Sequence, residues 1–110
     1  GYNMKSYMKH IKDDVFIKVL QYGDGHTCLR LVTDSGEPIV NATTNLNEGI
    51  LDTPTTVAIK GYSENEGVYE TLVHGKIISE SVAQYTGQFV NIPICYVIDE
   101  DVIRQIGELT

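Results

Sequence analysis

The stretch Tyr62-Ser63-Glu64-Asn65-Glu66-Gly67, which continues through residues 68–74 to Gly75, is the part of the sequence that most clearly predicts a local structure. Ser63 and Glu66 have the spacing of a capping box, in which each side chain bonds the backbone N–H of the other residue. Negative charge in a first helical turn is favoured by the helix dipole. Gly75 stands where a glycine commonly ends a helix. We therefore predict a helix over about residues 64–74.

The apolar residues of this helix predict which face is buried. Val68 and Leu72 form one i, i+4 pair, and Tyr69 and Val73 form another, so one stripe should pack on a sheet. Gly67 costs up to about 1 kcal/mol relative to alanine inside a helix. A glycine here indicates that another backbone approaches closely. A neighbouring strand or the preceding loop is the first interpretation, and a ligand or partner is the alternative.

Most of the remaining sequence has the composition of β-strands. Runs rich in β-branched and aromatic residues are separated by turn-forming glycine, proline and aspartate. These runs cover residues 15–22, 28–33, 39–44, 55–59 and 89–98, and a further strand is expected to begin at Ile77. Pro93 cannot donate a ladder hydrogen bond, so we expect it at a bulge or on an edge.

The chain ends in a second helical pattern. The acidic run at residues 99–101 is expected to cap a short helix over Val102–Ile106, which Gly107 would end. The pattern as a whole predicts an α+β fold. We expect a mostly antiparallel sheet of about five to six strands, with the central helix (about 64–74) packed on one face and a short C-terminal helix.

A length of 110 residues fits one domain, but the first residues differ from the rest in charge. Residues 1–14 contain Lys5, Lys9 and Lys12 and only two acidic residues. We expect residues 1–14 to form a flexible basic N-terminal arm, because polar termini are commonly disordered. Residues 15–110 are expected to form the single α+β domain.

The net charge of −7 limits the classes of partner. Direct nucleic-acid binding needs lysine and arginine along the phosphates, so we do not expect it. An acidic surface is compatible with a basic protein partner or with imitation of DNA, although solubility alone also explains it. No apolar run approaches the ~20 residues of a membrane span, and no apolar leader is present. These patterns predict a cytoplasmic protein without membrane association.

The sequence contains no strong catalytic or metal-binding motif. Asp24, His26 and Cys28 occupy alternate positions and would share one face of an extended strand, as a nucleophile and its base can. The glycines on both sides of Asp24 instead indicate a turn followed by a core strand. With Cys95 distant in sequence, two reduced core thiols are expected. We predict no catalytic residue, no metal site and no cofactor.

Several short strings of the sequence are distinctive when taken together: Gly36-Glu37-Pro38, residues 43–46, residues 57–60, Tyr62 to Gly67, Leu72-Val73, Gly87 and residues 89–95. In this order they resemble a family of small proteins of unknown function, which are carried by phages, plasmids and conjugative elements of Firmicutes and other gut bacteria. The similarity covers about residues 22–98, and its most specific part is Ser-Glu-Asn-Glu-Gly. The resemblance implies a bacterial, intracellular, mobile-element origin and supplies no catalytic residues.

These observations favour a non-catalytic protein-interaction module that acts as a mobile-element accessory protein. Its predicted partner-binding residues are Tyr62, Glu64, Asn65 and Glu66, at the start of the central helix. One alternative is an acidic inhibitor of a nucleic-acid-binding defence enzyme, and a second is a small enzyme. A homodimer is also compatible with the strand-rich pattern, because strands with little edge protection can pair with a second copy.

Overall fold

The computed structural model describes residues 3–46 and 49–110 and has the predicted α+β class. Over these residues it contains seven strands, a 3-10 turn and two α-helices, so the strand number exceeds the five to six expected. The strands are β1 (Phe16–Gln21), β2 (Thr27–Val32), β3 (Pro38–Asn41), β4 (Thr43–Thr44), β5 (Thr56–Ile59), β6 (Ala83–Thr86) and β7 (Asn91–Tyr96). The 3-10 turn is η1 (Ser63–Asn65), and the helices are α1 (Val68–His74) and α2 (Glu100–Leu109).

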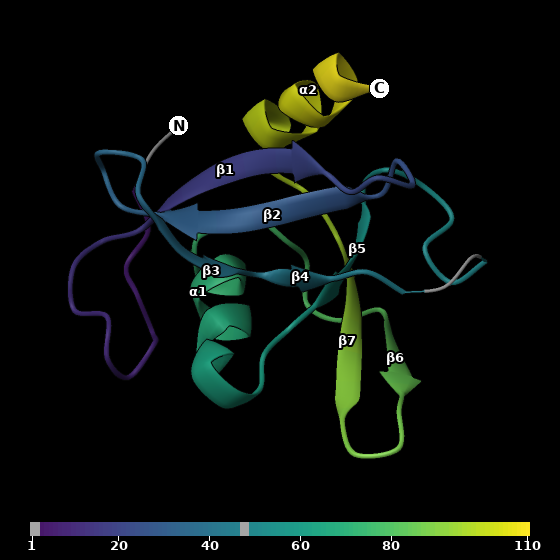
Figure 1. The fold of residues 1–110 in the computed structure, drawn as a ribbon, viewed down its shortest axis with the longest axis horizontal. Helices are drawn as coiled ribbons and strands as arrows, with labels where there is room; N and C mark the ends of the chain where they lie inside the picture. The colour runs from purple at the N-terminus through teal and green to yellow at the C-terminus, as the bar shows by residue number, and fades with distance from the viewer. Residues whose placement is uncertain (1–2, 47–48) are drawn as a thin grey trace.

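The strands form two antiparallel sheets in place of the single sheet expected. One sheet has the order β1-β2-β3 and the other has the order β4-β5-β7-β6 (Figure 1). Ala42 joins them, because its N–H donates to the carbonyl of Leu29 at 2.7 Å and its carbonyl accepts from the N–H of Lys60 at 2.8 Å. The chain therefore passes from one sheet to the other between β3 and β4.

The central helix is shorter than predicted and is not capped as predicted. It begins at Val68, and its N-cap residue Gly67 has a φ of +95°. Ser63 also has a positive φ, of 59°, and no side-chain capping bond is present. The N–H of Glu66 donates instead to the backbone carbonyl of Ser63 at 3.1 Å, which closes η1. The capping-box prediction is wrong because the backbone reverses at Gly67 before the helix starts.

The other end of α1 also differs in detail. Gly75 is helical, with a φ of −75°, and Lys76 takes the left-handed position with a φ of 62°. The N–H of Ile77 donates to the carbonyl of Leu72 at 3.0 Å, and the N–H of Lys76 donates to the carbonyl of Val73 at 3.1 Å. These two bonds form a Schellman motif. The helix thus ends near the predicted residue, with lysine in the place that glycine usually takes.

The N-terminal segment packs against the domain, so the boundary predicted at residue 15 is wrong for the described residues 3–14. Met4 and Met8 are only 3% and 6% exposed and belong to the main hydrophobic core. Met4 and Val15 exchange backbone hydrogen bonds of 2.8 and 2.9 Å. The N–H of Tyr7 donates to the Thr71 hydroxyl of α1 at 2.9 Å. Two apolar anchors and these bonds fix a segment whose other side chains are mostly polar.

Both glycines that flank α1 make room for this segment. A Cβ on Gly67 would lie 2.2 Å from the carbonyl oxygen of Tyr7 and 2.9 Å from the Cα of Met8. A Cβ on Gly75 would lie 2.7 Å from the sulfur of Met4. The predicted close approach at Gly67 therefore exists, and the approaching backbone is the N-terminal segment.

The cap predicted for the second helix is confirmed, whereas the end predicted for it is wrong. The Asp99 carboxylate accepts from the N–H of Val102 at 2.9 Å, and α2 continues through Gly107 to Leu109. Val102 and Ile106 are buried in the main core, and α2 packs beside β1. This core also contains Leu29, Leu31, Val57, Ile59, Val68 and Leu72.

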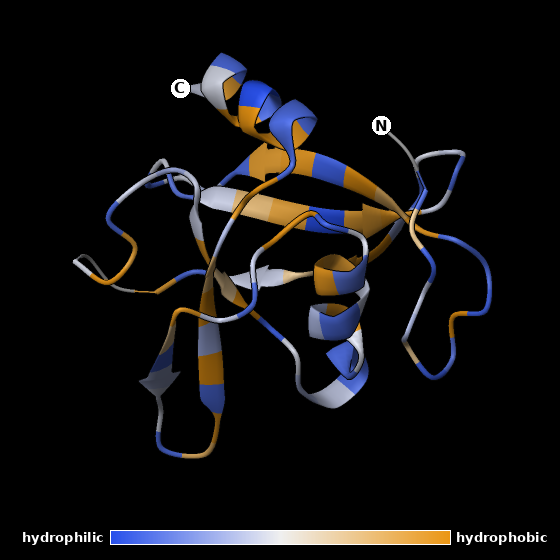
Figure 2. Ribbon diagram, turned by 180° about the vertical axis from the view of Figure 1, so that it is seen from behind, coloured by the Kyte–Doolittle hydropathy of each residue, from blue (hydrophilic) through white to orange (hydrophobic). Residues whose placement is uncertain are grey.

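A smaller apolar cluster lies at the other sheet. Ile92 and Ile94 of β7 pack there with Leu51 and Ala58, and the colours along β7 alternate accordingly in Figure 2. The β5–β7 pairing stops at Ile94, next to Pro93, which matches the edge position predicted for this proline. No helix in the described part of the chain is long and apolar enough to cross a membrane.

The two cysteines are buried free thiols. Cys28 lies in β2 and Cys95 lies in β7, in the strands where the sequence placed them. Burial raises the pKa of the Cys95 thiol to about 12, so it stays protonated at neutral pH. Both residues therefore act as small apolar side chains of the core.

We expect Gly67→Ala to destabilise the protein strongly. The new methyl group would overlap the backbone of Tyr7, and the φ of +95° is unfavourable for alanine. Left-handed strain costs about 1–2 kcal/mol and overpacking costs about 1–3 kcal/mol, so the free energy of unfolding should fall by about 2–5 kcal/mol. Urea unfolding followed by circular dichroism measures this change.

Gly107→Ala is the matched control. Gly107 lies inside α2, and no atom lies within 4 Å of the place that an added Cβ would take. Alanine should therefore raise the free energy of unfolding, by up to about 1 kcal/mol. Equal effects of the two substitutions would contradict the contact between Gly67 and the N-terminal segment.

Candidate functional site

The predicted partner-binding residues lie on η1 and the residues on either side of it. Tyr62, Glu64 and Glu66 are exposed, whereas Asn65 is buried. The 3-10 turn causes this division, because it directs Asn65 toward the sheets and leaves its neighbours on the surface. The structure therefore brings together three of the four predicted residues as one surface, which we call the η1 surface (Tyr62, Glu64 and Glu66).

Lys60 links two residues of the η1 surface. Its ammonium group lies 5.7 Å from the centre of the Tyr62 ring and 3.2 Å from a carboxylate oxygen of Glu64. The pKa of the Glu64 carboxyl is lowered to about 2, first by its own backbone N–H and then by the Ser63 hydroxyl and Lys60. Glu64 is thus ionised and oriented, although it is exposed to solvent.

Asn65 has a structural role instead of the predicted binding role. Its side chain is 1% exposed, and its amide nitrogen donates to the carbonyls of Asn41 at 2.6 Å and Lys60 at 3.0 Å. These carbonyls lie at the end of β3 and just after β5. Asn65 therefore ties η1 to both sheets and is not available to a partner.

A groove runs beside the η1 surface, between β3 and the N-terminal segment. It has a volume of about 500 Å³. Its floor and sides are largely apolar, and charged side chains stand at its rim. We call it the β3 groove, and it is lined by Met8, Lys9, His10, Ile11, Ile39, Val40, Ser63, Glu64 and Glu66.

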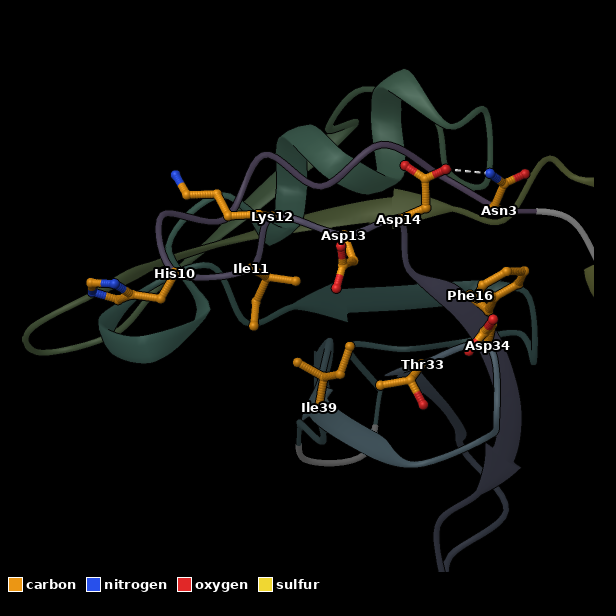
Figure 3. Close-up of a pocket in the computed structure, with 10 residues that line it drawn as sticks. All are labelled: Asn3, His10, Ile11, Lys12, Asp13, Asp14, Phe16, Thr33, Asp34 and Ile39. Carbon is orange, nitrogen blue, oxygen red and sulfur yellow. Dashed lines mark hydrogen bonds between the residues drawn. The ribbon is translucent and has the colours of Figure 1, made fainter.

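A second hollow of about 550 Å³ adjoins the β3 groove and shares His10, Ile11 and Ile39 with it. Figure 3 shows that Ile11 and Ile39 point toward one another, whereas His10 points away. Asp14 is hydrogen-bonded to the amide of Asn3 at the far end of this hollow (Figure 3). The Ile11–Ile39 pair therefore separates a more polar hollow from the more apolar β3 groove.

Tyr62 faces a third hollow on the opposite side of η1. This hollow has a volume of about 340 Å³ and lies between α1 and the β6–β7 hairpin. Tyr69 and Pro93 also line it, and the Tyr69 hydroxyl accepts from the N–H of Ser81 at 2.9 Å. The η1 surface thus stands between two hollows, with the glutamates on one side and Tyr62 on the other.

The apolar part of the β3 groove could not be predicted from the sequence. Met8 and Ile11 come from the segment expected to be flexible, and Ile39 and Val40 come from a strand expected to lie inside a single sheet. The one signal in the sequence was the presence of apolar residues at positions 8 and 11 of a polar segment. Their partners come from β3, which is distant in sequence.

The structure brings Asp24 and His26 together but does not make them a nucleophile–base pair with Cys28. The Nδ1 atom of His26 lies 2.6 Å from the Asn45 side-chain oxygen and 3.3 Å from Asp24. Asp24 also accepts from the N–H of His26 at 3.0 Å and from the Asn45 amide at 2.7 Å, and these bonds lower its pKa. Cys28 is buried in β2. This group therefore stabilises the β1–β2 turn and holds it to Asn45.

No group of three or more potential metal ligands occurs in residues 3–46 and 49–110.

Comparison of the chain with protein-family models gives no match, and searches of curated proteins and of solved structures give none either. The resemblance to small mobile-element proteins stays a prediction.

We expect Glu64 to contribute to stability in a pH-dependent way. Its pKa is lowered from 4.5 to about 2, so the ionised form is favoured by folding. The contribution is present above pH 4.5 and is lost as the pH falls through about 2. The difference in Tm between the native protein and Glu64→Gln should therefore shrink over this range. Parallel Tm profiles would contradict the interaction.

We expect Asn65→Ala to weaken the attachment of η1 to the sheets. The substitution leaves the carbonyls of Asn41 and Lys60 without their donor. A buried polar group without a partner costs about 1–3 kcal/mol, and the free energy of unfolding should fall by at least this amount. Asn91→Ala is the control, since Asn91 is exposed, and it should change the unfolding free energy little.

Proposed function

We propose that this chain is a non-catalytic protein-interaction module that binds an extended segment of a protein partner. The segment would lie in the β3 groove and reach the η1 surface. The observation that carries the proposal is the largely apolar groove of about 500 Å³ beside two exposed glutamates. A bacterial mobile-element origin, implied by the sequence resemblance, is part of this proposal.

The apolar part of the groove supports a side-chain anchor. Ile11, Ile39 and Val40 are only partly buried, although they pack on the main core. An aliphatic or aromatic side chain of the partner would cover their remaining surface. Burial of apolar surface contributes about 25 cal/mol per Å², so one fully buried anchor contributes about 2 kcal/mol.

The charges at the rim support a basic residue in the partner. Glu64 already has Lys60 at 3.2 Å, whereas Glu66 has no ion pair within the described residues. The chain as a whole carries a net charge of −7. A lysine or arginine placed next to the apolar anchor would pair with Glu66, and the net charge would accelerate its approach.

The shape of β3 favours binding through side chains over addition of a strand. The pairing of β2 with β3 shifts in register next to Ile39, which forms a β-bulge, and Pro38 begins the strand. Bulges and prolines are devices that prevent further pairing at a sheet edge. The proposed partner segment therefore lies across the groove without extending the sheet.

A peptide-display library tests this proposal directly. Peptides selected on the intact protein should share an apolar residue close to a lysine or arginine. A selected peptide should shift the amide NMR signals of Ile39, Val40 and Glu66 on titration. Glu66→Lys should weaken binding of this peptide by about tenfold or more, because it replaces an attraction by a repulsion.

Glu80→Lys is the matched control for this charge reversal. Glu80 is exposed and does not line the β3 groove, so the change in net charge is the same at a different place. Equal weakening by both variants would mean that only net charge matters. Shifted signals confined to other surfaces would show that the β3 groove is not the binding site.

A further inference from the structure

The β6–β7 hairpin takes no part in the proposed function and has an open edge. Figures 1 and 2 both show this hairpin at the end of the molecule opposite α2, with its turn pointing outward. Strand β6 is the last strand of its sheet, and within the described part of the chain it pairs only with β7. All four of its residues, Ala83–Thr86, are exposed. The hairpin therefore presents free backbone donors and acceptors to solvent.

This hairpin lies in an uncharged stretch of a strongly charged chain. Residues 81–98 contain no aspartate, glutamate, lysine, arginine or histidine, although charged residues make up 21% of the sequence. Two copies that each carry a net charge of −7 repel one another. Along the hairpin itself, two copies can meet without placing like charges opposite one another. A basic partner, in contrast, would find no carboxylate on the hairpin itself, although Glu70 of α1 lines the hollow beside it.

The hairpin also exposes large apolar side chains. Phe89 at its tip is 88% exposed, Val82 before β6 is 51% exposed, and Tyr85 in β6 is exposed as well. Contiguous exposed apolar surface commonly marks an interaction site. The hairpin therefore combines an open backbone edge with apolar side chains that a second copy would cover.

The β6 edge lacks the protection that other edges of this protein have. Strand β3 has a proline and a bulge, and β1 carries Lys18 and packs beside α2. Strand β6 has the sequence Ala-Gln-Tyr-Thr and pairs regularly with β7 over all four residues. A regular, uncharged edge is a template for pairing with another strand.

The hydrogen-bond pattern shows which backbone groups point outward. The N–H of Gly87 donates to the carbonyl of Val90 at 2.8 Å, and the register places Tyr85 opposite Ile92. In an antiparallel ladder every second pair exchanges hydrogen bonds, so Tyr85 bonds toward β7. The N–H and carbonyl groups of Gln84 and Thr86 therefore point to the open edge.

We propose that the β6 edge is a self-association site, at which β6 pairs antiparallel with β6 of a second copy. With a two-fold axis at Tyr85, Gln84 of one copy and Thr86 of the other exchange backbone hydrogen bonds on both sides of the axis. The same register places Val82 of one copy opposite Gln88 of the other, beside the hairpin tip that carries Phe89. The site is isologous, as in most homodimers.

Light scattering coupled to size-exclusion chromatography tests this proposal across a range of protein concentrations. The native protein should change from the chain mass of 12.2 kDa to twice that mass as its concentration rises. Thr86→Pro removes an outward N–H and spares the β6–β7 ladder, so it should fold and remain monomeric. Phe89→Lys should raise the dissociation constant of the dimer by about tenfold or more.

Leu109→Lys is the matched control, because Leu109 is an exposed apolar residue on α2 and the charge change is the same. It should leave the dimer intact. Circular dichroism verifies that each variant is folded. A native protein that stays at 12.2 kDa at every concentration would overturn the proposal, as would a dimer that both hairpin variants leave unchanged.

Discussion

The contact between the N-terminal segment and Gly67 is the constraint on which the surface of this protein depends. The carbonyl of Tyr7 and the Cα of Met8 occupy the space that any other side chain at position 67 would need. This contact places the segment across the start of α1, where Met8 enters the core and Ile11 meets Ile39. One wall of the β3 groove therefore depends on the absence of a Cβ atom at residue 67.

The second constraint is the transfer of one strand between two sheets at Ala42. The N–H of Ala42 donates to a carbonyl of β2, and its carbonyl accepts from the N–H of the residue that follows β5. Strand β3 therefore pairs with β2, whereas β4 pairs with β5. Because β5 pairs with β4 and β7 and not with β3, the outer side of β3 is left without a strand, and Asn65 fills part of the space. The groove is thus a result of topology, and η1 closes one end of it.

The sequence predicted most elements well and their connections poorly, for physical reasons. The strand expected to begin at Ile77 is only an isolated bridge at Ile78, and the strand that pairs with β7 begins at Ala83. Hydrophobic alternation and β-branched composition identify strands, and Asp99 identifies the start of α2, because these signals are local. The capping box failed because the positive φ angles at Ser63 and Gly67 belong to a backbone reversal that the distant N-terminal segment packs against. The same reversal decides that Asn65 is buried and that Glu64 and Glu66 are exposed, so three of the four predicted site residues lie on the surface.

The distribution of charge distinguishes the β3 edge from the β6 edge. The β3 edge lies in a groove whose rim carries Lys9, Glu64 and Glu66, so it can select a partner by charge. The β6 edge has only backbone groups and uncharged side chains, so selection there rests on shape and hydrogen bonding. Because each copy carries a net charge of −7, contact between copies is disfavoured at the β3 edge, where charged side chains would meet. The uncharged β6 edge does not add this local repulsion. Because the two proposed sites share no residue, binding of a protein partner at one would not compete with self-association at the other.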